Sequence, residues 1–144
     1  MKRSANPLVE AHACLCFALR KASRSASRRY DAALRPSGLR STQFNLLVVL
    51  DATGTIASGA LADRVGIERT TLTRNLAVLL RSGLISVAPG TDRRSRQVRI
   101  TARGRRAAIR AMPAWRRAQA AITAELGADV VELAGRLAAR RTTT

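Results

Sequence analysis

The spacing of apolar and polar positions predicts a chain built mainly from helices. From Pro7 to about Leu34, small or apolar residues recur every three or four positions, which is the period of one helical face. The dipeptide NP at 6–7 is a typical helix start, and PSG at 36–38 is a typical helix end. This first helix would be roughly 28 residues long, so part of its apolar face is expected to meet another chain.

Shorter elements separated by turn residues are expected in the centre of the chain. In order, they are a helix capped by Ser41, a very short strand at 55–57, a helix capped by Ser58 and ended by Gly66, a helix opened by Glu68 or Thr70 and ended by Gly83, and paired strands at 84–88 and 97–100. The buried face of the helix before Gly83 is expected to consist of four leucines, Leu72, Leu76, Leu79 and Leu80.

Two more helices are expected after the strands. Thr101 caps the first of them, and Pro113 is expected to kink or split it, because proline lacks the backbone N–H that an α-helix uses. The last helix is expected to run from shortly after this proline to about Arg140, with Gly127 as a weak point. The whole pattern predicts a mainly α fold with a small β-hairpin.

Residues 58–83 have the pattern of a helix-turn-helix, with Gly66 permitting the left-handed turn between the two helices. The second helix of such a motif enters the major groove of DNA, where Arg, Asn and Thr side chains pair with bases and phosphates. The alternative interpretation is that the threonine-rich start of this helix only caps it. The candidate DNA-binding residues at the helix start are Arg69, Thr70, Thr71, Thr73, Arg74 and Asn75.

The loop between the two strands, PGTDRRSR at 89–96, is strongly basic. A hairpin tip of this kind can insert an arginine into the adjacent minor groove, which makes Arg93, Arg94 and Arg96 candidate DNA-binding residues. Asp92 lies among them and is expected to orient one arginine by a charge-assisted hydrogen bond. The alternative role of Asp92 is that of an ordinary turn residue.

The charge of the chain favours a polyanionic partner. The formal net charge is +17, the pI is about 11.9, and all but Lys2 and Lys21 of the 26 basic residues are arginine. Such a field suits nucleic acid or an anionic membrane surface, although an arginine-rich composition also arises in GC-rich genomes. The sequence contains no apolar run long enough to span a bilayer and no clear signal peptide, so we expect a cytoplasmic protein that does not bind membranes.

Three segments carry a resemblance to a known family: 38–47, 59–85 and 90–104. The last is the most specific, because it joins an Asp-Arg-Arg wing to a Thr-x-x-Gly sequence that opens a helix. On these segments the chain resembles the MarR family of winged-helix transcriptional regulators, and with the flanking helices the match covers roughly residues 8–140. Arg40 departs from the pattern, since many relatives have a capping threonine at that position.

The resemblance implies a winged helix-turn-helix core with long N- and C-terminal dimerisation helices. It implies a single domain over residues 1–144, with a DNA-binding lobe at 38–101 and dimerisation helices at 6–35 and 102–140. The candidates on the fourth helix would then lie on the recognition helix, with Asp92 and Arg94 on the wing and Arg94 inserted into a groove. A homodimer would place two recognition helices about one DNA turn apart, on a pseudo-palindromic operator. The alternative is that the terminal helices pack only within one chain.

Cys14 and Cys16 form the most ambiguous pair in the sequence. On a helix, positions i and i+2 point about 200° apart, so an intrahelical disulfide is not expected. One interpretation is that both are small buried hydrophobes, and the other is redox sensing, in which oxidation of one thiol shifts the dimer and releases DNA. A metal site formed by His12 and Cys16 lacks a third ligand and is not expected.

Regulators of this family also bind small aromatic or anionic ligands between the dimerisation helices and the DNA-binding lobe. The resemblance therefore implies an effector pocket, for which Phe17, Arg20, Trp115 and Arg116 are the candidate lining residues. Trp115 has an alternative role as a core or interface residue.

The sequence as a whole predicts a sequence-specific regulator of transcription that binds double-stranded DNA. We expect a homodimeric repressor that a small ligand or cysteine oxidation releases from DNA. The alternative is an architectural nucleic-acid-binding protein without sequence preference. The single histidine and the lack of paired carboxylates, a phosphate loop or a catalytic triad argue against an enzyme, and no cofactor is expected.

Overall fold

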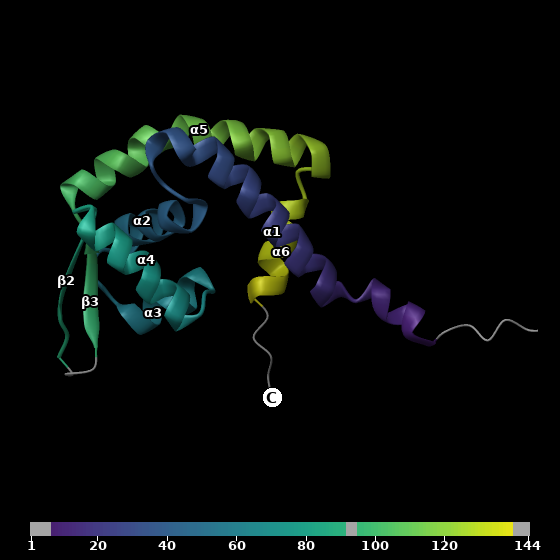
Figure 1. The fold of residues 1–144 in the computed structure, drawn as a ribbon, viewed down its shortest axis with the longest axis horizontal. Helices are drawn as coiled ribbons and strands as arrows, with labels where there is room; N and C mark the ends of the chain where they lie inside the picture. Colours follow the sequence, from purple (N-terminus) through teal and green to yellow (C-terminus); the bar gives the residue numbers. More distant parts are fainter. Residues whose placement is uncertain (1–6, 92–94, 140–144) are drawn as a thin grey trace, which may run out of the picture.

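The computed structural model describes residues 7–91 and 95–139 of the chain (Figure 1). Helices dominate these residues, and the antiparallel sheet has the strand order β1-β3-β2. The predicted mainly α fold with a small β wing is therefore confirmed. The elements are η1 (Pro7–Ala13), α1 (Leu15–Leu34), η2 (Arg35–Ser37), α2 (Ser41–Thr53), β1 (Ile56–Ala57), α3 (Ser58–Val65), α4 (Arg69–Arg81), β2 (Ile85–Pro89), β3 (Arg96–Ile100), α5 (Ala102–Leu126) and α6 (Val130–Ala139).

The core is built around α2. Phe44, Leu46, Leu47 and Leu50 are fully or almost fully buried, and they lie on more than one side of this helix. Because the buried face of α2 is broad, it packs against α1, α3, α4, α5 and β3 at once. Figure 1 shows α2 between α5 on one side and the pair α3 and α4 on the other.

A side chain of α1 stabilises the start of α2. The backbone N–H of Ser41 donates to Asp31 Oδ1 at 2.7 Å, and the N–H of Arg40 donates to Gln43 Oε1 at 3.0 Å. The expected cap by Ser41 is therefore wrong, because Ser41 is the first helical residue and a carboxylate from α1 takes the capping role. Ser58 is likewise the first residue of α3 rather than its cap.

The single long N-terminal helix expected from Pro7 to Leu34 is also wrong. Residues 7–13 form a 3-10 helix, and Cys14 has an extended backbone with φ −61° and ψ 118° before α1 begins. Leu8 and Val9 are exposed, so burial in the core does not hold the first turns in α-helical geometry. The periodic spacing of these residues correctly predicts helical structure, but it does not show that the helix is interrupted.

Pro113 does not split the fifth helix. α5 continues from Ala102 to Leu126 as one arching helix (Figure 1), and the break falls at Gly127, with φ 93°. Proline removes one hydrogen bond from the ladder, but Ala111 on one side of it is fully buried and Trp115 on the other packs against the core. Tertiary packing on both sides therefore holds the helix together across the proline.

The first turn of α5 approaches the base of the β-hairpin closely. Thr101 Oγ1 accepts from the N–H of Gly104 at 3.0 Å and donates to the carbonyl of Gly83 at 2.7 Å, so the expected cap by Thr101 is confirmed. A Cβ atom at position 104 would lie 2.0 Å from the carbonyl oxygen of Leu84. Only glycine allows this contact, which fixes α5 to the hairpin.

No helix in the ranges that the structure describes is both long and apolar enough to cross a membrane.

Replacing Gly104 with alanine is expected to destabilise the fold by about 2–3 kcal/mol, because the added methyl group overlaps a backbone carbonyl that cannot move freely. Chemical denaturation followed by circular dichroism measures this change. Gly135→Ala is the matched control, because a Cβ at that helical position meets no atom within 4 Å. The control is expected to be neutral or slightly stabilising. Equal effects of the two substitutions would contradict the close approach.

Candidate nucleic-acid interface

The joint between α3 and α4 has the geometry of a helix-turn-helix. Gly66 adopts the left-handed conformation with φ 71° and ψ 37°, and its N–H donates to the carbonyl of Ala62 at 2.9 Å. The N–H of Ile67 donates to the same carbonyl at 3.1 Å, and the Ile67 side chain packs partly buried against the core. The tight turn predicted at Gly66 is therefore present.

Buried leucines hold α4 against the core and turn its opposite side outward. Leu72 and Leu79 are almost fully buried, whereas Thr70, Thr71, Thr73 and Arg74 are exposed. At about 100° per residue, Thr70 and Arg74 point most directly away from the two buried leucines. They form the centre of the exposed face of α4, which a major groove can accept.

Hydrogen bonds within α4 restrict two of the predicted residues. Thr73 Oγ1 donates to the carbonyl of Arg69 at 2.8 Å, and Asn75 Nδ2 donates to the carbonyl of Thr71 at 2.8 Å. The hydroxyl oxygen of Thr73 keeps lone pairs for a donor, while half-buried Asn75 lies toward the side of the helix. Asn75 is thus less well oriented for base contact than Arg74.

The exposed face of α4 continues beyond the residues that the sequence singled out. Ala77 and Val78 lie one turn after Arg74 and are exposed. The sequence interpretation missed them because they belong to an apolar run that reads as core. The helical spacing would have identified them, because they lie three and four residues after Arg74. Exposed methyl groups at these positions suit contact with the methyl group of thymine.

The wing consists of β2 and β3, with Val87 paired with Val98 and Pro89 paired with Arg96. The N–H of Gly90 donates to the carbonyl of Ser95 at 2.8 Å and closes the described part of the hairpin. Asp92, Arg93 and Arg94 lie outside the described residues, so the predictions for them remain predictions. The paired strands therefore determine where the tip of the hairpin begins and where it ends.

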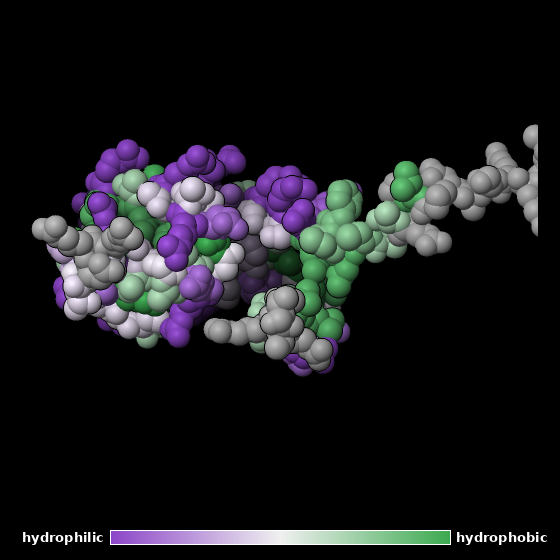
Figure 2. Space-filling model, turned by 90° about the horizontal axis from the view of Figure 1, so that it is seen from below, coloured by the Kyte–Doolittle hydropathy of each residue, from purple (hydrophilic) through white to green (hydrophobic). Residues whose placement is uncertain are grey.

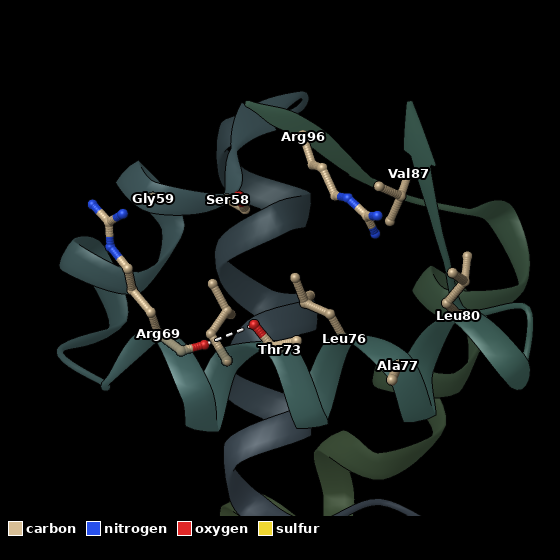
Figure 3. A pocket seen from close by; sticks show the side chains of 10 residues that line it. Ser58, Gly59, Arg69, Thr73, Leu76, Ala77, Leu80, Val87 and Arg96 are labelled. Atoms are coloured by element: carbon tan, nitrogen blue, oxygen red, sulfur yellow. Dashed lines mark hydrogen bonds between the residues drawn. The ribbon is translucent and has the colours of Figure 1, made fainter. Parts of the chain in front are cut away.

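A groove of about 370 Å³ separates α4 from the wing (Figure 3). Its lining is largely apolar, and Leu80 is 46% exposed within it, so the expectation that Leu80 belongs to the buried face of α4 is wrong. Leu76 is only partly buried for the same reason. α4 and the wing therefore do not pack against each other along their whole length.

Two predicted arginines lie at opposite ends of this groove. Figure 3 shows Arg96 extending from β3 into the groove over Val87, whereas Arg69 points away from it toward the start of α3. A guanidinium nitrogen of Arg69 would lie 3.7 Å from a Cβ at Gly59. The structure therefore separates Arg69 from Arg96 and directs them to different parts of the surface.

The basic side chains of this surface form no ion pair with another described residue. Across residues 7–91 and 95–139, the side-chain ion pairs are Arg29–Glu125 at 2.8 Å and Arg105–Asp51 at 3.1 Å. Neither involves α4 or the wing, so Arg69, Arg74 and Arg96 keep their charge available for phosphates.

Comparisons with known proteins agree with this geometry. A model of the MarR family matches residues 37–95. The transcriptional regulator MosR of M. tuberculosis, solved in complex with DNA, is 44% identical, with 87% of this chain and 93% of that chain covered and a TM-score of 0.77. The chain belongs to the MarR family of transcriptional regulators. Comparison with curated protein sequences yields no match.

Two further family structures have the same fold. The transcriptional repressor CouR, bound to a 23-mer DNA duplex, is 28% identical, with 91% of this chain and 94% of that chain covered and a TM-score of 0.74. A cysteine-to-serine mutant of E. coli MarR, complexed with operator DNA, is 21% identical, with 90% of this chain and 94% of that chain covered and a TM-score of 0.75. At the latter identity the likeness concerns the fold alone.

Both cysteines of this MarR-family chain are exposed free thiols, which contradicts their interpretation as buried hydrophobes in the single chain. The premise that both lie on one helix is also wrong, because Cys14 precedes α1 with an extended backbone. Cys16 lines a surface hollow of about 590 Å³ together with Leu15 and Leu19 of α1 and Leu137 of α6. The Cys16 thiol therefore lies where α1 approaches α6.

The predicted effector residues do not come together. Trp115 stacks on Phe44, with ring centroids 6.1 Å apart, and both line a cavity of about 220 Å³ between α1, α2 and α5. Phe17 is exposed near the start of α1, and Arg20 lines the hollow beside Cys16 instead. The role of Trp115 in the core is confirmed, since its ring packs against the buried cluster.

Tyr30 closes one side of the cavity beside Trp115 by donating its hydroxyl hydrogen bond to Gln119 Oε1, which joins α1 to α5. Burial raises the pKa of Tyr30 above its ordinary value of 10.0, and the nearby guanidinium of Arg29 acts in the opposite direction. Because the pKa is raised in the folded state, the contribution of this group to stability is complete below pH 10 and is lost as the pH rises through the folded pKa.

Ultraviolet difference titration is expected to report a pKa above 10.0 for the folded protein. The chain contains one tyrosine, so the signal belongs to Tyr30 alone. Repeating the titration in denaturant is expected to return the ordinary value, and Tyr30→Phe should remove the signal. A folded pKa at or below 10.0 would show that the phenol is not desolvated in the α1–α5 contact.

Proposed function

We propose that this chain is a cytoplasmic, sequence-specific regulator of transcription that binds double-stranded DNA as a homodimer and acts as a repressor. The observation that carries the proposal is the exposed face of α4, where Thr70 and Arg74 point outward while Leu72 and Leu79 are buried. The wing beside it would place its basic tip in the neighbouring minor groove. The DNA complexes of MosR and CouR support the same use of this fold.

The same argument assigns DNA binding and dimerisation to different parts of the chain. Residues 38–101 would form the DNA-binding lobe, and residues 6–35 and 102–140 would form the dimerisation helices. Figure 2 shows apolar side chains gathered where the start of α1 lies close to α6. A second copy of the chain would cover this surface and set the spacing of the two recognition helices. Its most exposed members include Leu15, Phe17, Leu133 and Leu137.

Oxidation of Cys14 or Cys16 is the regulatory step that we propose. A peroxide would transfer one oxygen atom to a thiolate, forming a sulfenic acid and releasing water or hydroxide. Exposure of both thiols in the single chain and the position of Cys16 in the hollow between α1 and α6 support this step. A polar group formed there would disturb the packing of the terminal helices and thereby the spacing of the DNA-binding lobes. A small aromatic or anionic effector remains the second proposed way of releasing DNA.

Arg74→Ala is expected to reduce discrimination between the selected operator and random DNA by about 1–3 kcal/mol, because a guanidinium can pair with one guanine edge. Arg94→Ala is expected to weaken binding to both duplexes alike and to lower the salt dependence. Fluorescence anisotropy with a duplex selected from a random pool measures both effects. Arg28→Ala on α1 is the control. The assigned roles fail if neither arginine alters DNA affinity, or if random DNA binds as tightly as the operator.

Peroxide is expected to release the wild-type protein from DNA, and Cys14→Ser or Cys16→Ser is expected to abolish that release without changing the affinity of the reduced protein. Gel-shift titration before and after peroxide treatment, followed by thiol reduction, measures the effect. The sensor proposal is wrong if peroxide has no effect or if both serine variants respond like the wild type. DNA binding by the reduced protein is scored separately, so regulation can fail while the DNA-binding proposal stands.

A further inference from the structure

A row of arginines follows one face of α5. Arg103, Arg106, Arg110 and Arg117 are separated by three, four and seven residues, which places them on one side of a helix. At 1.5 Å per residue the row is about 21 Å long. These four residues are called the arginine ridge below.

The arginine ridge faces away from the recognition helix. Ala108 lies nearly opposite the ridge on α5, and it is buried against the core together with Ala107 and Ala111, which lie between it and the ridge. Figure 1 shows α5 across α2 from α3 and α4, so the helix that carries the ridge and the recognition helix lie on different sides of α2.

The charge of the ridge is not balanced by the chain. All four arginines are exposed, and the ion pairs of the described residues engage Arg29 and Arg105 instead. Like charges three and four residues apart on a helix repel each other, so the ridge weakens α5 unless an anion lies against it. A row of unpaired arginines therefore indicates a polyanionic occupant.

The composition of the ridge favours a phosphate backbone over an acidic protein or a membrane. The positions that continue the row are Pro113 or Ala114 and Ala120 or Ala121, so the row itself carries no aromatic or large aliphatic side chain, and the exposed Ile109 beside Arg106 is a single apolar residue. Protein interfaces need an apolar centre, and membrane-bound helices need an apolar face to insert. A duplex strand presents one phosphate per about 3.4 Å of its axis, so the ridge lies beside about six phosphates.

We propose that the arginine ridge binds the backbone of a second DNA duplex, without reading its sequence, so that one protein dimer bridges two duplexes. The ridge is a surface separate from α4 and the wing, and bridging rests on the proposed function because the recognition helices hold the first duplex. Guanidinium groups would bind phosphate oxygens in pairs of hydrogen bonds, which requires no groove and no base edge.

A two-duplex capture assay tests the proposal. A biotinylated duplex selected from a random pool is bound to beads and saturated with protein, and a fluorescent duplex of unrelated sequence is then added at low salt. Protein retained on the beads reports the first interface, and captured fluorescence reports the second. The ridge variant carries Arg106→Gln, Arg110→Gln and Arg117→Gln. Arg103 is kept because its side chain lies beside Gly83, near the junction of α5 and the hairpin.

The control variant removes the same charge elsewhere, through Lys21→Gln, Arg28→Gln and Arg136→Gln. Wild type and control are expected to capture the second duplex, and the ridge variant is expected to capture it at least about fivefold less, because fewer counterions are released. All three proteins are expected to be retained equally on the first duplex, which also shows that the ridge variant is folded.

Several outcomes would overturn bridging. They are an absence of second-duplex capture by the wild type, equal capture by the ridge and control variants, or loss of the ridge variant from the first duplex. Binding of immobilised polyglutamate through the ridge, without duplex capture, would assign the surface to an acidic protein instead. Failure of the wild type to bind the first duplex would overturn the proposed function itself, which the separate readout distinguishes.

Discussion

α2 buries one broad face in the core, and the positions of the other elements depend on that burial. Leu46, Leu47 and Leu50 contact neighbours that come from both ends of the chain, because α1, α3, α4, α5 and β3 all pack on this one short helix. Only a narrow stripe of α2, which includes Asn45, Val48 and Ala52, faces solvent. Displacing α2 would move the recognition helix and the terminal helices together.

The contacts between α1 and the rest of the chain determine how α1 is oriented on the core. Asp31 caps the start of α2, Tyr30 donates to Gln119 on α5, and Arg29 pairs with Glu125 near the end of α5. The cap, the hydrogen bond and the ion pair are directional, so they determine the angle of α1 as well as its distance. α1 thus connects the region of Cys16 at its start to the DNA-binding lobe at its end.

Unpaired positive charge is the second general property of the molecule. Few carboxylates are present, and the two ion pairs of the described residues lie away from α4 and the wing. Folding such a chain concentrates like charges, which costs stability in the absence of a polyanion. The same excess of positive charge stabilises a complex with DNA. Added salt weakens this stabilisation steeply. The stability of the fold and the affinity for DNA therefore both depend on the same excess of positive charge.

Local chemistry was enough to predict the helix-turn-helix, the short strand at 55–57, the cap by Thr101 and the hairpin, because glycine geometry, capping and strand alternation operate over a few residues. Tertiary packing decided the rest. The break at Cys14 follows a segment whose Leu8 and Val9 are exposed, whereas the continuity of α5 through Pro113 reflects core contacts that offset a lost hydrogen bond.

The same distinction applies to the candidate site. Sequence alone identified the polar side of α4, since the spacing of Leu72 and Leu79 determines which residues face outward. It did not identify the exposure of Leu80 in the groove or the opposite directions of Arg69 and Arg96, because both depend on where the wing crosses α4. The close approach of Gly104 to Leu84 is of the same kind, because these residues come together only when α5 folds back on the base of the hairpin.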